Sequence, residues 1–273
     1  MRAALACAAV ACAALAPLRA QEPSRDLLLQ RTAAYVQRFV DGLTNVVAEE
    51  ELKQEFRLSA PRRRTLRSDF LLVRYPGEEK LYLTFRDVLE VDGRPVRDQQ
   101  ERITRLFLEP FRDAVRRAGE IQRDGLRHSA PNGRLADPLE VTAYLQEHYH
   151  ENFRFSVGRS APKWGADVRE LHLTQIIDVG SQQIPIQATA WIAEGSGRVV
   201  RTELRTGRGP SSRVTTTTFG VDGALQIDVP IEMRDSMPLG RDDEFLGTAV
   251  YRNFRRFQVR ADQELQEPVT PPR

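Results

Sequence analysis

Cysteine is nearly absent from this chain. The 273 residues include two, Cys7 and Cys12, and both lie close to the first residue. The rest of the chain therefore cannot carry a disulfide framework. A domain of this length buries enough apolar surface to fold without covalent cross-links.

Net charge is lacking as well. The chain has 40 basic and 38 acidic residues, which gives a formal charge of +2. Arg2 and Arg19 supply that excess, so the chain from Gln21 onward is neutral. A protein that binds nucleic acid without sequence preference needs a net basic surface, so we expect no nucleic-acid partner.

Long apolar runs occur only at the N-terminus. Residues 1–20 read MRAALACAAVACAALAPLRA, with a basic Arg2, an apolar run and the small Ala20 before polar residues. That is the layout of a secretory signal peptide. We expect cleavage after Ala20, a periplasmic or secreted protein and no membrane span in the mature chain. The alternative is lipidation at Cys12.

The common catalytic motifs are missing too. The sequence has no Gly-x-Ser-x-Gly elbow, phosphate-binding loop or Gly-x-Gly-x-x-Gly fingerprint. The acidic runs Glu49–Glu51 and Asp242–Glu244 leave a carboxylate hydrolase open, because such pairs assemble in space rather than in sequence. A solvated surface explains both runs more simply, so no catalytic residue is assigned.

Histidine offers the best candidates for a metal site. His148 and His150 lie close to Glu151, and His172 is a possible third imidazole, a set that can hold zinc. Residues two apart point in different directions on a helix. We therefore assign neither a metal nor a cofactor, and a metal-dependent hydrolase remains an alternative.

The first part of the chain predicts one helix followed by strands. Ser24 can cap a helix over residues 25–43, in which apolar residues recur at helical spacing. Residues 45–96 are predicted as strands, with turns at Pro76-Gly77 and Asp92-Gly93. The basic cluster Arg62–Arg64 is interpreted as a solvated loop.

Helical patterns then occupy residues 98–150. Asp98 begins a capping box, and a loop is expected over 127–136. Asp137 starts a second helix, with a proline in its first turn, which we expect to end near His150.

Residues 152–259 alternate between apolar and polar residues and are separated by tight turns, which predicts antiparallel strands. In the last strand Gly247, Ala249 and Tyr251 share one face, whereas Phe254 and Phe257 break the alternation. A bulge near Asn253 would return both aromatic rings to the core face. Truncating Phe257 should then be costly, and the tail 261–273 should be disordered and dispensable.

These patterns predict an α+β fold. We expect a large, strongly curved antiparallel sheet, resembling half a barrel, with the N-terminal helix and two or three central helices on its concave side. Residues 21–260 should form one domain around one continuous sheet, because neither half has an obvious core of its own.

Four stretches of the mature chain resemble a group of uncharacterised exported bacterial proteins. They are Asn45–Glu50, Ser68–Val73, Phe85–Val96 and Tyr251–Phe257. This resemblance covers most of the chain and implies no activity.

The C-terminal half is also similar to the periplasmic lipoprotein-carrier fold of the LolA and RseB kind. The similarity is a series of strands that ends in a polar turn, a Pro-x-Glu-Met-Arg stretch and an aromatic strand, here Pro230–Phe257. The resemblance implies a curved antiparallel sheet that wraps an apolar cavity under helices. It transfers no functional residue.

We therefore predict an exported, non-enzymatic envelope protein that binds a lipid, an acyl chain or a lipidated protein segment. A curved sheet with an apolar inner face would form a concave binding site. The residues expected to line it are Phe153, Phe155, Leu171, Leu173, Ile186 and Trp191. The alternatives are that these residues form plain core, or that the protein is an envelope scaffold using its exposed sheet edge. The sequence predicts no oligomeric state.

Overall fold

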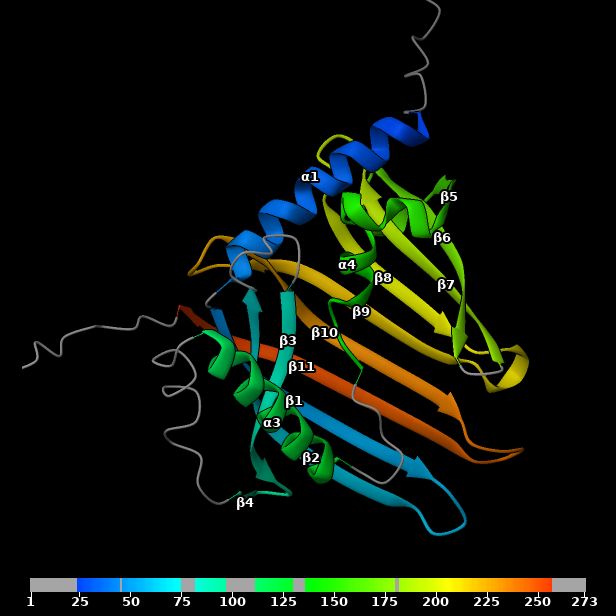
Figure 1. The fold of residues 1–273 in the computed structure, drawn as a ribbon. Coiled ribbons are helices and arrows are strands. Elements are labelled where there is room, and N and C mark those ends of the chain that lie inside the picture. Colours follow the sequence, from blue (N-terminus) through cyan, green and yellow to red (C-terminus); the bar gives the residue numbers. More distant parts are fainter. Residues whose placement is uncertain are drawn as a thin grey trace, which may run out of the picture.

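One open, curved antiparallel sheet dominates the computed structural model, and a few helices contact its strands (Figure 1). The structure describes residues 24–44, 46–74, 82–96, 111–129, 136–179 and 182–256. The predictions for the leader, for Pro76-Gly77, for the helix start at Asp98, for Phe257 and for the tail lie outside the described residues.

The strands and helices have the following bounds. The strands are β1 (Val46–Arg57), β2 (Arg62–Arg74), β3 (Tyr82–Val91), β4 (Arg94–Pro95), β5 (Arg154–Ser160), β6 (Val168–Val179), β7 (Gln182–Ala193), β8 (Val199–Thr206), β9 (Arg213–Asp222), β10 (Ile227–Pro238) and β11 (Glu244–Arg256). The helices are α1 (Arg25–Leu43), α3 (Phe111–His128) and α4 (Glu140–Tyr144), with short 3-10 turns η1 (Glu147–Asn152), η2 (Pro162–Trp164) and η3 (Gly209–Ser211).

The sheet consists of two meanders, β1 to β4 and β5 to β11, which are joined where β1 pairs with β11. Its order is β4-β3-β2-β1-β11-β10-β9-β8-β7-β6-β5. The first and last strands of the described chain, β1 and β11, pair from Val46 opposite Arg256 to Arg57 opposite Glu244. The expected continuous antiparallel sheet is therefore present.

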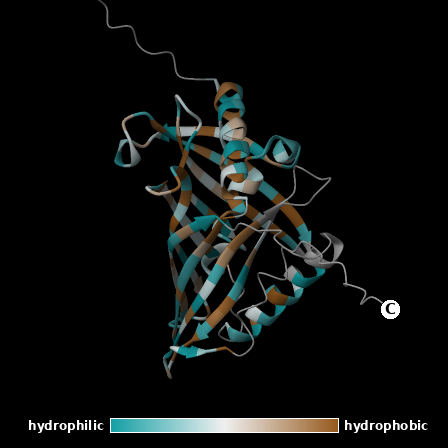
Figure 2. Ribbon diagram, turned by 90° about the vertical axis from the view of Figure 1, so that its left-hand side faces the viewer, coloured by the Kyte–Doolittle hydropathy of each residue, from teal (hydrophilic) through white to brown (hydrophobic). Residues whose placement is uncertain are grey.

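Alternation along the strands gives the sheet two faces, and Figure 2 shows apolar and polar residues in turn along them. In β1, Leu52 and Phe56 are buried whereas Glu51 and Lys53 lie toward solvent. Leu52 shares a hydrophobic cluster with the buried side of α1. We call the face of the sheet that meets α1 the inner face, and the opposite one the outer face.

Helix α1 begins and ends where the sequence predicts. The Ser24 side chain accepts a hydrogen bond from the Leu27 amide, which satisfies an otherwise free N–H of the first turn. Leu28, Val36 and Val40 form a buried stripe that joins the main core. None of the described helices is long and apolar enough to span a bilayer.

The interpretation of Arg62–Arg64 as a loop is wrong, because β2 begins at Arg62. Arg63 lies opposite Glu55 on β1, with 3.4 Å between Nη2 and Oε1, and the nearby Arg67 pairs with Glu90 on β3 at 2.7 Å. Opposite charges across neighbouring strands stabilise a sheet, so this arginine-rich segment is compatible with strand structure.

The second central helix is much shorter than predicted. Instead of running to His150, α4 ends at Tyr144, and η1 follows. Gln146 between them has an extended backbone, with φ −71° and ψ 144°, which breaks the helix. The break allows Leu145 to be fully buried while the Tyr144 ring packs on Phe153, with ring centroids 4.7 Å apart.

The predicted bulge in the last strand is confirmed. The register between β1 and β11 shifts between Val47 and Glu49, where β11 has one extra residue. Asn253 has φ +52°, and its side chain donates to Glu49 Oε2 at 2.8 Å. As a result Phe254 packs against the main core.

Candidate functional site

Four of the six residues predicted to line a ligand site are buried together on the inner face. Phe153, Leu171, Leu173 and Ile186 belong to one hydrophobic cluster, and Phe155, half-buried, packs against it. Strand β6 pairs with β7 without a register shift. The β7 residues opposite Leu171 and Leu173 therefore lie on the same face of the sheet as these two leucines.

The placement of Trp191 on this face is wrong. Ile186 and Trp191 differ by an odd number of positions on an unbroken strand, so their side chains point to opposite faces. Trp191 lies beside Trp164, with ring centroids 6.3 Å apart, and the Arg201 guanidinium sits over both rings. It therefore takes no part in an inner-face site.

Residues 136–152 cover this apolar surface, and we call them the cover segment. Leu139, Val141 and Leu145 from this segment enter the same cluster as the inner-face residues. The cover segment contains only the five-residue α4 and the six-residue η1 as regular structure. In this state the apolar surface is thus packed core beneath a short, irregular layer of chain.

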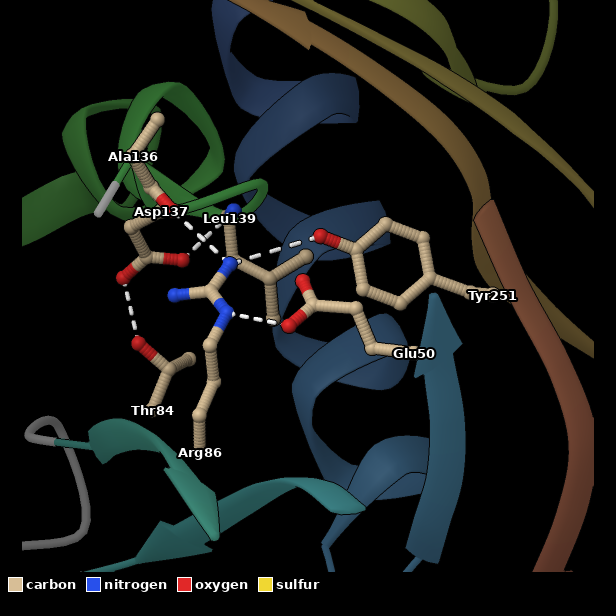
Figure 3. A network of polar contacts seen from close by, with 7 residues as sticks. All are labelled: Glu50, Thr84, Arg86, Ala136, Asp137, Leu139 and Tyr251. Atoms are coloured by element: carbon tan, nitrogen blue, oxygen red, sulfur yellow. Dashed lines mark hydrogen bonds and ion pairs between the residues drawn. The ribbon is translucent and has the colours of Figure 1, made fainter. Parts of the chain in front are cut away.

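A buried polar network fastens the cover segment to the sheet (Figure 3). At its centre is Arg86 of β3, whose side chain is 8% exposed. Its Nε donates to Glu50 Oε2 at 2.5 Å, and its Nη2 donates to the Ala136 carbonyl at 2.8 Å. Nη2 also lies 3.4 Å from the Tyr251 hydroxyl. The guanidinium thus ties β1 and β11 to the start of the cover segment.

Two further residues on the same face of β3 hold the next part of the cover segment. The Thr84 hydroxyl donates to the carboxylate of Asp137, whose other oxygen accepts from the Leu139 amide at 2.8 Å. The Tyr82 hydroxyl donates to the Leu139 carbonyl at 3.3 Å. Because side chains alternate along a strand, Tyr82, Thr84 and Arg86 form one row of polar anchors beneath residues 136–139.

Burial controls the protonation of this network. Burial raises the pKa of the Asp137 carboxyl above its ordinary value, although the Thr84 hydroxyl and the Leu139 amide act in the opposite direction. Burial and the Glu50 charge raise the pKa of the Tyr251 hydroxyl. Burial, the largest single effect, lowers the pKa of Arg86, but the charge and hydrogen bond of Glu50 together with Tyr251 and Asp137 outweigh it and raise that pKa, so Arg86 stays cationic.

Sequence reasoning did not single out this network. Glu50 lies inside an acidic run that was interpreted as a solvated surface, but only every second residue of β1 faces solvent. Asp137 was expected to begin a helix, and its carboxylate does accept a backbone amide, two residues on. In the sequence, the sign that could have revealed this network is that polar Thr84 and Arg86 alternate with apolar residues within a predicted strand.

A cleft of about 830 Å³ opens between α1 and η1, which is part of the cover segment. Its lining combines apolar and polar side chains: Asp26, Leu29, Gln30, Ala33, Ala34, Gln37, Gln146, Glu147, His148 and His150. Leu29 packs against the main core, and the His150 ring contacts Phe155 with centroids 5.1 Å apart. The cleft therefore borders the apolar interior.

The three candidate histidines do not meet. His148 and His150 line the cleft, whereas His172 lies on the outer face, where Nδ1 is 3.1 Å from the Thr189 hydroxyl. Leu171 and Leu173 on either side of His172 face inward, so the strand turns His172 away from the cleft. Within the described ranges, no three His, Cys, Asp or Glu residues are grouped to hold a metal ion.

The two acidic runs are also far apart. Glu50 faces inward, and Glu244 lies opposite Arg57, seven residues further along β1. At about 3.3 Å per residue this separates them by about 23 Å along the strands. A pair of glycosidase carboxylates is separated by roughly 5–9.5 Å.

Comparison with known proteins gives only remote structural neighbours. No protein-family model matches the chain, and no curated protein matches it significantly. A LolA superfamily protein from Nitrosomonas europaea is 11% identical, with 84% of this chain and 95% of that chain covered and a TM-score of 0.36. A DUF1329 family protein from Desulfovibrio piger is 12% identical, with 85% and 91% covered and a TM-score of 0.41.

A third solved structure, from Vibrio parahaemolyticus, is described as an outer membrane lipoprotein-sorting protein domain. It is 12% identical, with 83% of this chain and 92% of that chain covered and a TM-score of 0.40. Two of the three descriptions name the LolA superfamily or lipoprotein sorting, as the resemblance stated from the sequence does. All three TM-scores lie below 0.5, so these likenesses assign neither a ligand nor an activity to this chain.

Proposed function

We propose that this protein is a non-enzymatic carrier that binds a lipid, an acyl chain or a lipidated protein segment against the inner face of its sheet. The observation that carries the proposal is the nature of the cover segment. Apolar core residues of the sheet lie beneath a short, irregular stretch of chain that polar anchors hold in place. Such a cover can be displaced without unfolding the sheet.

This displacement is possible because the ligand would replace the cover segment as the apolar partner of the sheet. Leu171 and Leu173 are fully buried in this state, so exposing them to water would cost about 1.5–3 kcal/mol for each side chain. An acyl chain that replaced the cover segment would keep them out of water. On this proposal the concave inner face is the binding surface, and the ligand takes the place of residues 136–152.

The cleft between α1 and η1 is the proposed route of entry. It borders the cover segment, and Leu29 connects its wall with the main core. Export forms part of the proposal as well, because residues 1–20 have the layout of a signal peptide. An envelope protein with this fold would meet lipids and lipidated segments in its own compartment.

The first test is direct. Protein purified from the periplasm of an expressing bacterium should carry extractable lipid, detected by native mass spectrometry, and should bind a fluorescent fatty acid in a saturable way. Protein that carries no lipid and binds no fluorescent fatty acid would contradict the proposal.

Two leucines of α1 offer a matched pair of variants. Leu29 lines the cleft, whereas Leu27 is 38% exposed on the same helix. Leu29→Gln should weaken binding of the fluorescent fatty acid about tenfold, because roughly 1.4 kcal/mol of apolar contact is lost. Leu27→Gln should leave the affinity unchanged. Equal effects of the two variants would exclude this cleft as the entry route.

A further inference from the structure

A second cleft lies at the opposite edge of the sheet, between the C-terminal end of α3 and the hairpin of β3 and β4. Its volume is about 730 Å³. The lining residues come from β2, from the hairpin and from the last turn of α3: Arg64, Val91, Asp92, Arg94, Pro95, Val96, Arg127 and His128.

Basic groups dominate this lining. Three arginines and a histidine face one acidic residue, Asp92. Asp92 is already engaged, because its Oδ1 accepts from the Thr65 amide at 2.8 Å and its Oδ2 lies 4.0 Å from Arg64 Nε. The cleft therefore has a surplus of positive charge that its own carboxylate does not neutralise.

Two of the guanidinium groups are available to a ligand. Arg94 is exposed and has no ion-pair partner among the described residues. Arg127 pairs with Asp124 at 3.4 Å, but its side chain is 80% exposed, and exposed pairs of this kind contribute little. Arg64 instead donates to the His128 and Ser129 carbonyls at 2.8 and 3.2 Å, so it offsets the negative end of the α3 dipole.

The floor of the cleft is apolar and adjoins the core. Val91 and Val96 both pack against the main hydrophobic cluster, and Val91 lies opposite the buried Leu66 of β2. The cleft thus combines a basic rim with an apolar floor. The cleft between α1 and η1 differs in charge, because its lining includes Asp26 and Glu147 and neither lysine nor arginine among the described residues.

We propose that this basic cleft holds the anionic group of an amphiphile while the first carbons of its acyl chain lie on the apolar floor of the cleft. The inference rests on the proposed carrier function and specifies its ligand class as amphiphiles with a carboxylate or phosphate. Arginine suits both groups, since its planar fork donates two parallel hydrogen bonds to a pair of oxygen atoms. Arg94 and Arg127 recognise the headgroup, and Val91 and Val96 contact the first carbons of the chain.

Three probes test this assignment by titration calorimetry at low salt: dodecanoate, 1-dodecanol and inorganic phosphate. Dodecanoate should bind at least tenfold more tightly than 1-dodecanol, and the difference should shrink as salt is raised. The double variant Arg94→Gln/Arg127→Gln should weaken dodecanoate binding at least tenfold and leave 1-dodecanol binding unchanged.

The control variant Arg154→Gln/Arg205→Gln removes the same charge from exposed positions on β5 and β8 and should change neither affinity. Equal binding of dodecanoate and 1-dodecanol, unaffected by either double variant, would overturn the headgroup site and leave the carrier function standing. Failure of both to bind would overturn the carrier function itself. Tight binding of phosphate with no binding of dodecanoate would assign the cleft to free anions and overturn the amphiphile assignment.

Discussion

Two buried charges beneath the cover segment, Glu50 and Arg86, form an ion pair. Glu50 and Arg86 are 36 positions apart in the chain and are nearly removed from water. Taking two charges out of water costs several kcal/mol for each ion, and the contact between them offsets this only while both are present. Arg86 also lies over the Phe70 ring, 5.4 Å from its centroid, so apolar packing supports its position.

Removal of one partner of this pair should therefore be severe. We expect Arg86→Met to lower the free energy of unfolding by about 3–5 kcal/mol, because Glu50 would remain as an uncompensated buried charge. The double variant Glu50→Leu/Arg86→Met should recover much of that loss, since apolar residues of similar volume replace both charges. Urea denaturation of the two variants measures the difference. A double variant less stable than Arg86→Met would contradict this account.

Asp137 should make stability depend on pH. Its pKa is raised in the folded state by burial, so the folded protein binds a proton more readily than the unfolded chain does. The contribution of Asp137 to the free energy of unfolding is fully present at a pH below 3.8, the ordinary pKa of this carboxyl. It is lost as the pH rises through the higher pKa of the folded state. The difference in unfolding free energy between wild type and Asp137→Asn should therefore fall as the pH is raised from about 3.5 to 7. Denaturation at a series of pH values checks this, and a difference that grows with pH would contradict it.

Two local backbone features determine how elements join. Asn253 adopts a left-handed conformation at the bulge of β11, which turns Phe254 toward the core. Gly197 adopts φ +73° in the turn between β7 and β8 and lies against the backbone of α1. Both residues have a positive φ, which few residues adopt. At Asn253 this conformation turns Phe254 toward the core, and at Gly197 it lets the turn lie against α1.

At the bulge, substitution should follow backbone preference. Asn253→Val should destabilise the protein by about 1–2 kcal/mol more than Asn253→Gly, because a branched side chain opposes a left-handed backbone. Both variants lose the hydrogen bond to Glu49, so their difference isolates the conformational effect. Thermal denaturation compares them. Equal melting temperatures would mean that the bulge does not impose this conformation.

Gly197 should tolerate no side chain. A Cβ at this position would lie 2.3 Å from the backbone of Arg31, and its φ is also unfavourable for alanine. Gly197→Ala should cost at least about 1–3 kcal/mol and loosen the contact of α1 with the sheet. Gly223→Ala is the matched control, since no atom lies within 4 Å of the added carbon, and should change stability by less than about 0.5 kcal/mol. Hydrogen exchange in α1 would then be faster in the Gly197 variant alone.

At the scale of the whole molecule, the pairing of β1 with β11 makes the two meanders a single unit. Strands from both meanders contribute to one hydrophobic cluster with α1 and the cover segment. The polar network also joins the two meanders and the cover segment, because Arg86 on β3 contacts Tyr251 on β11 and Ala136 in the cover segment. Neither meander can lose its structure without exposing the core of the other.

Unfolding should therefore be a single cooperative transition. The two tryptophans, Trp164 and Trp191, both lie in the second meander, so their fluorescence reports on that half of the sheet. Far-ultraviolet circular dichroism reports on all strands and helices. The two signals should change at the same urea concentration. An early fluorescence transition followed by a separate change in circular dichroism would show that the meanders unfold independently.

Much of this arrangement could be predicted from short-range patterns. Ser24 and the apolar stripe after it predict α1, alternation predicts most strands, and the spacing of Tyr251 and Phe254 predicts a bulge at Asn253. These features depend on neighbours a few residues apart in the chain. The resemblance to the lipoprotein-carrier fold likewise came from a pattern of consecutive strands.

Other features required the tertiary structure. Arg62 and Arg64 looked like part of a loop, because their cross-strand partners lie elsewhere in the chain. Trp191 was grouped with Ile186 although an odd number of positions separates them on one strand. A helix to His150 was expected, but burial of Leu145 and the contact between Tyr144 and Phe153 outweigh helix propensity there.

The sequence by itself determined the helix at the N-terminus, the antiparallel strands, the last bulge and the small net charge, since each depends on local periodicity or on composition. Only the tertiary structure decided that Glu50 meets Arg86, that residues 136–152 cover the apolar face, and that Arg94 and Arg127 share a cleft. The physical reason is that strand order and register bring together residues far apart in the chain. The energy of a charge or an apolar side chain depends on those neighbours, which no local pattern records.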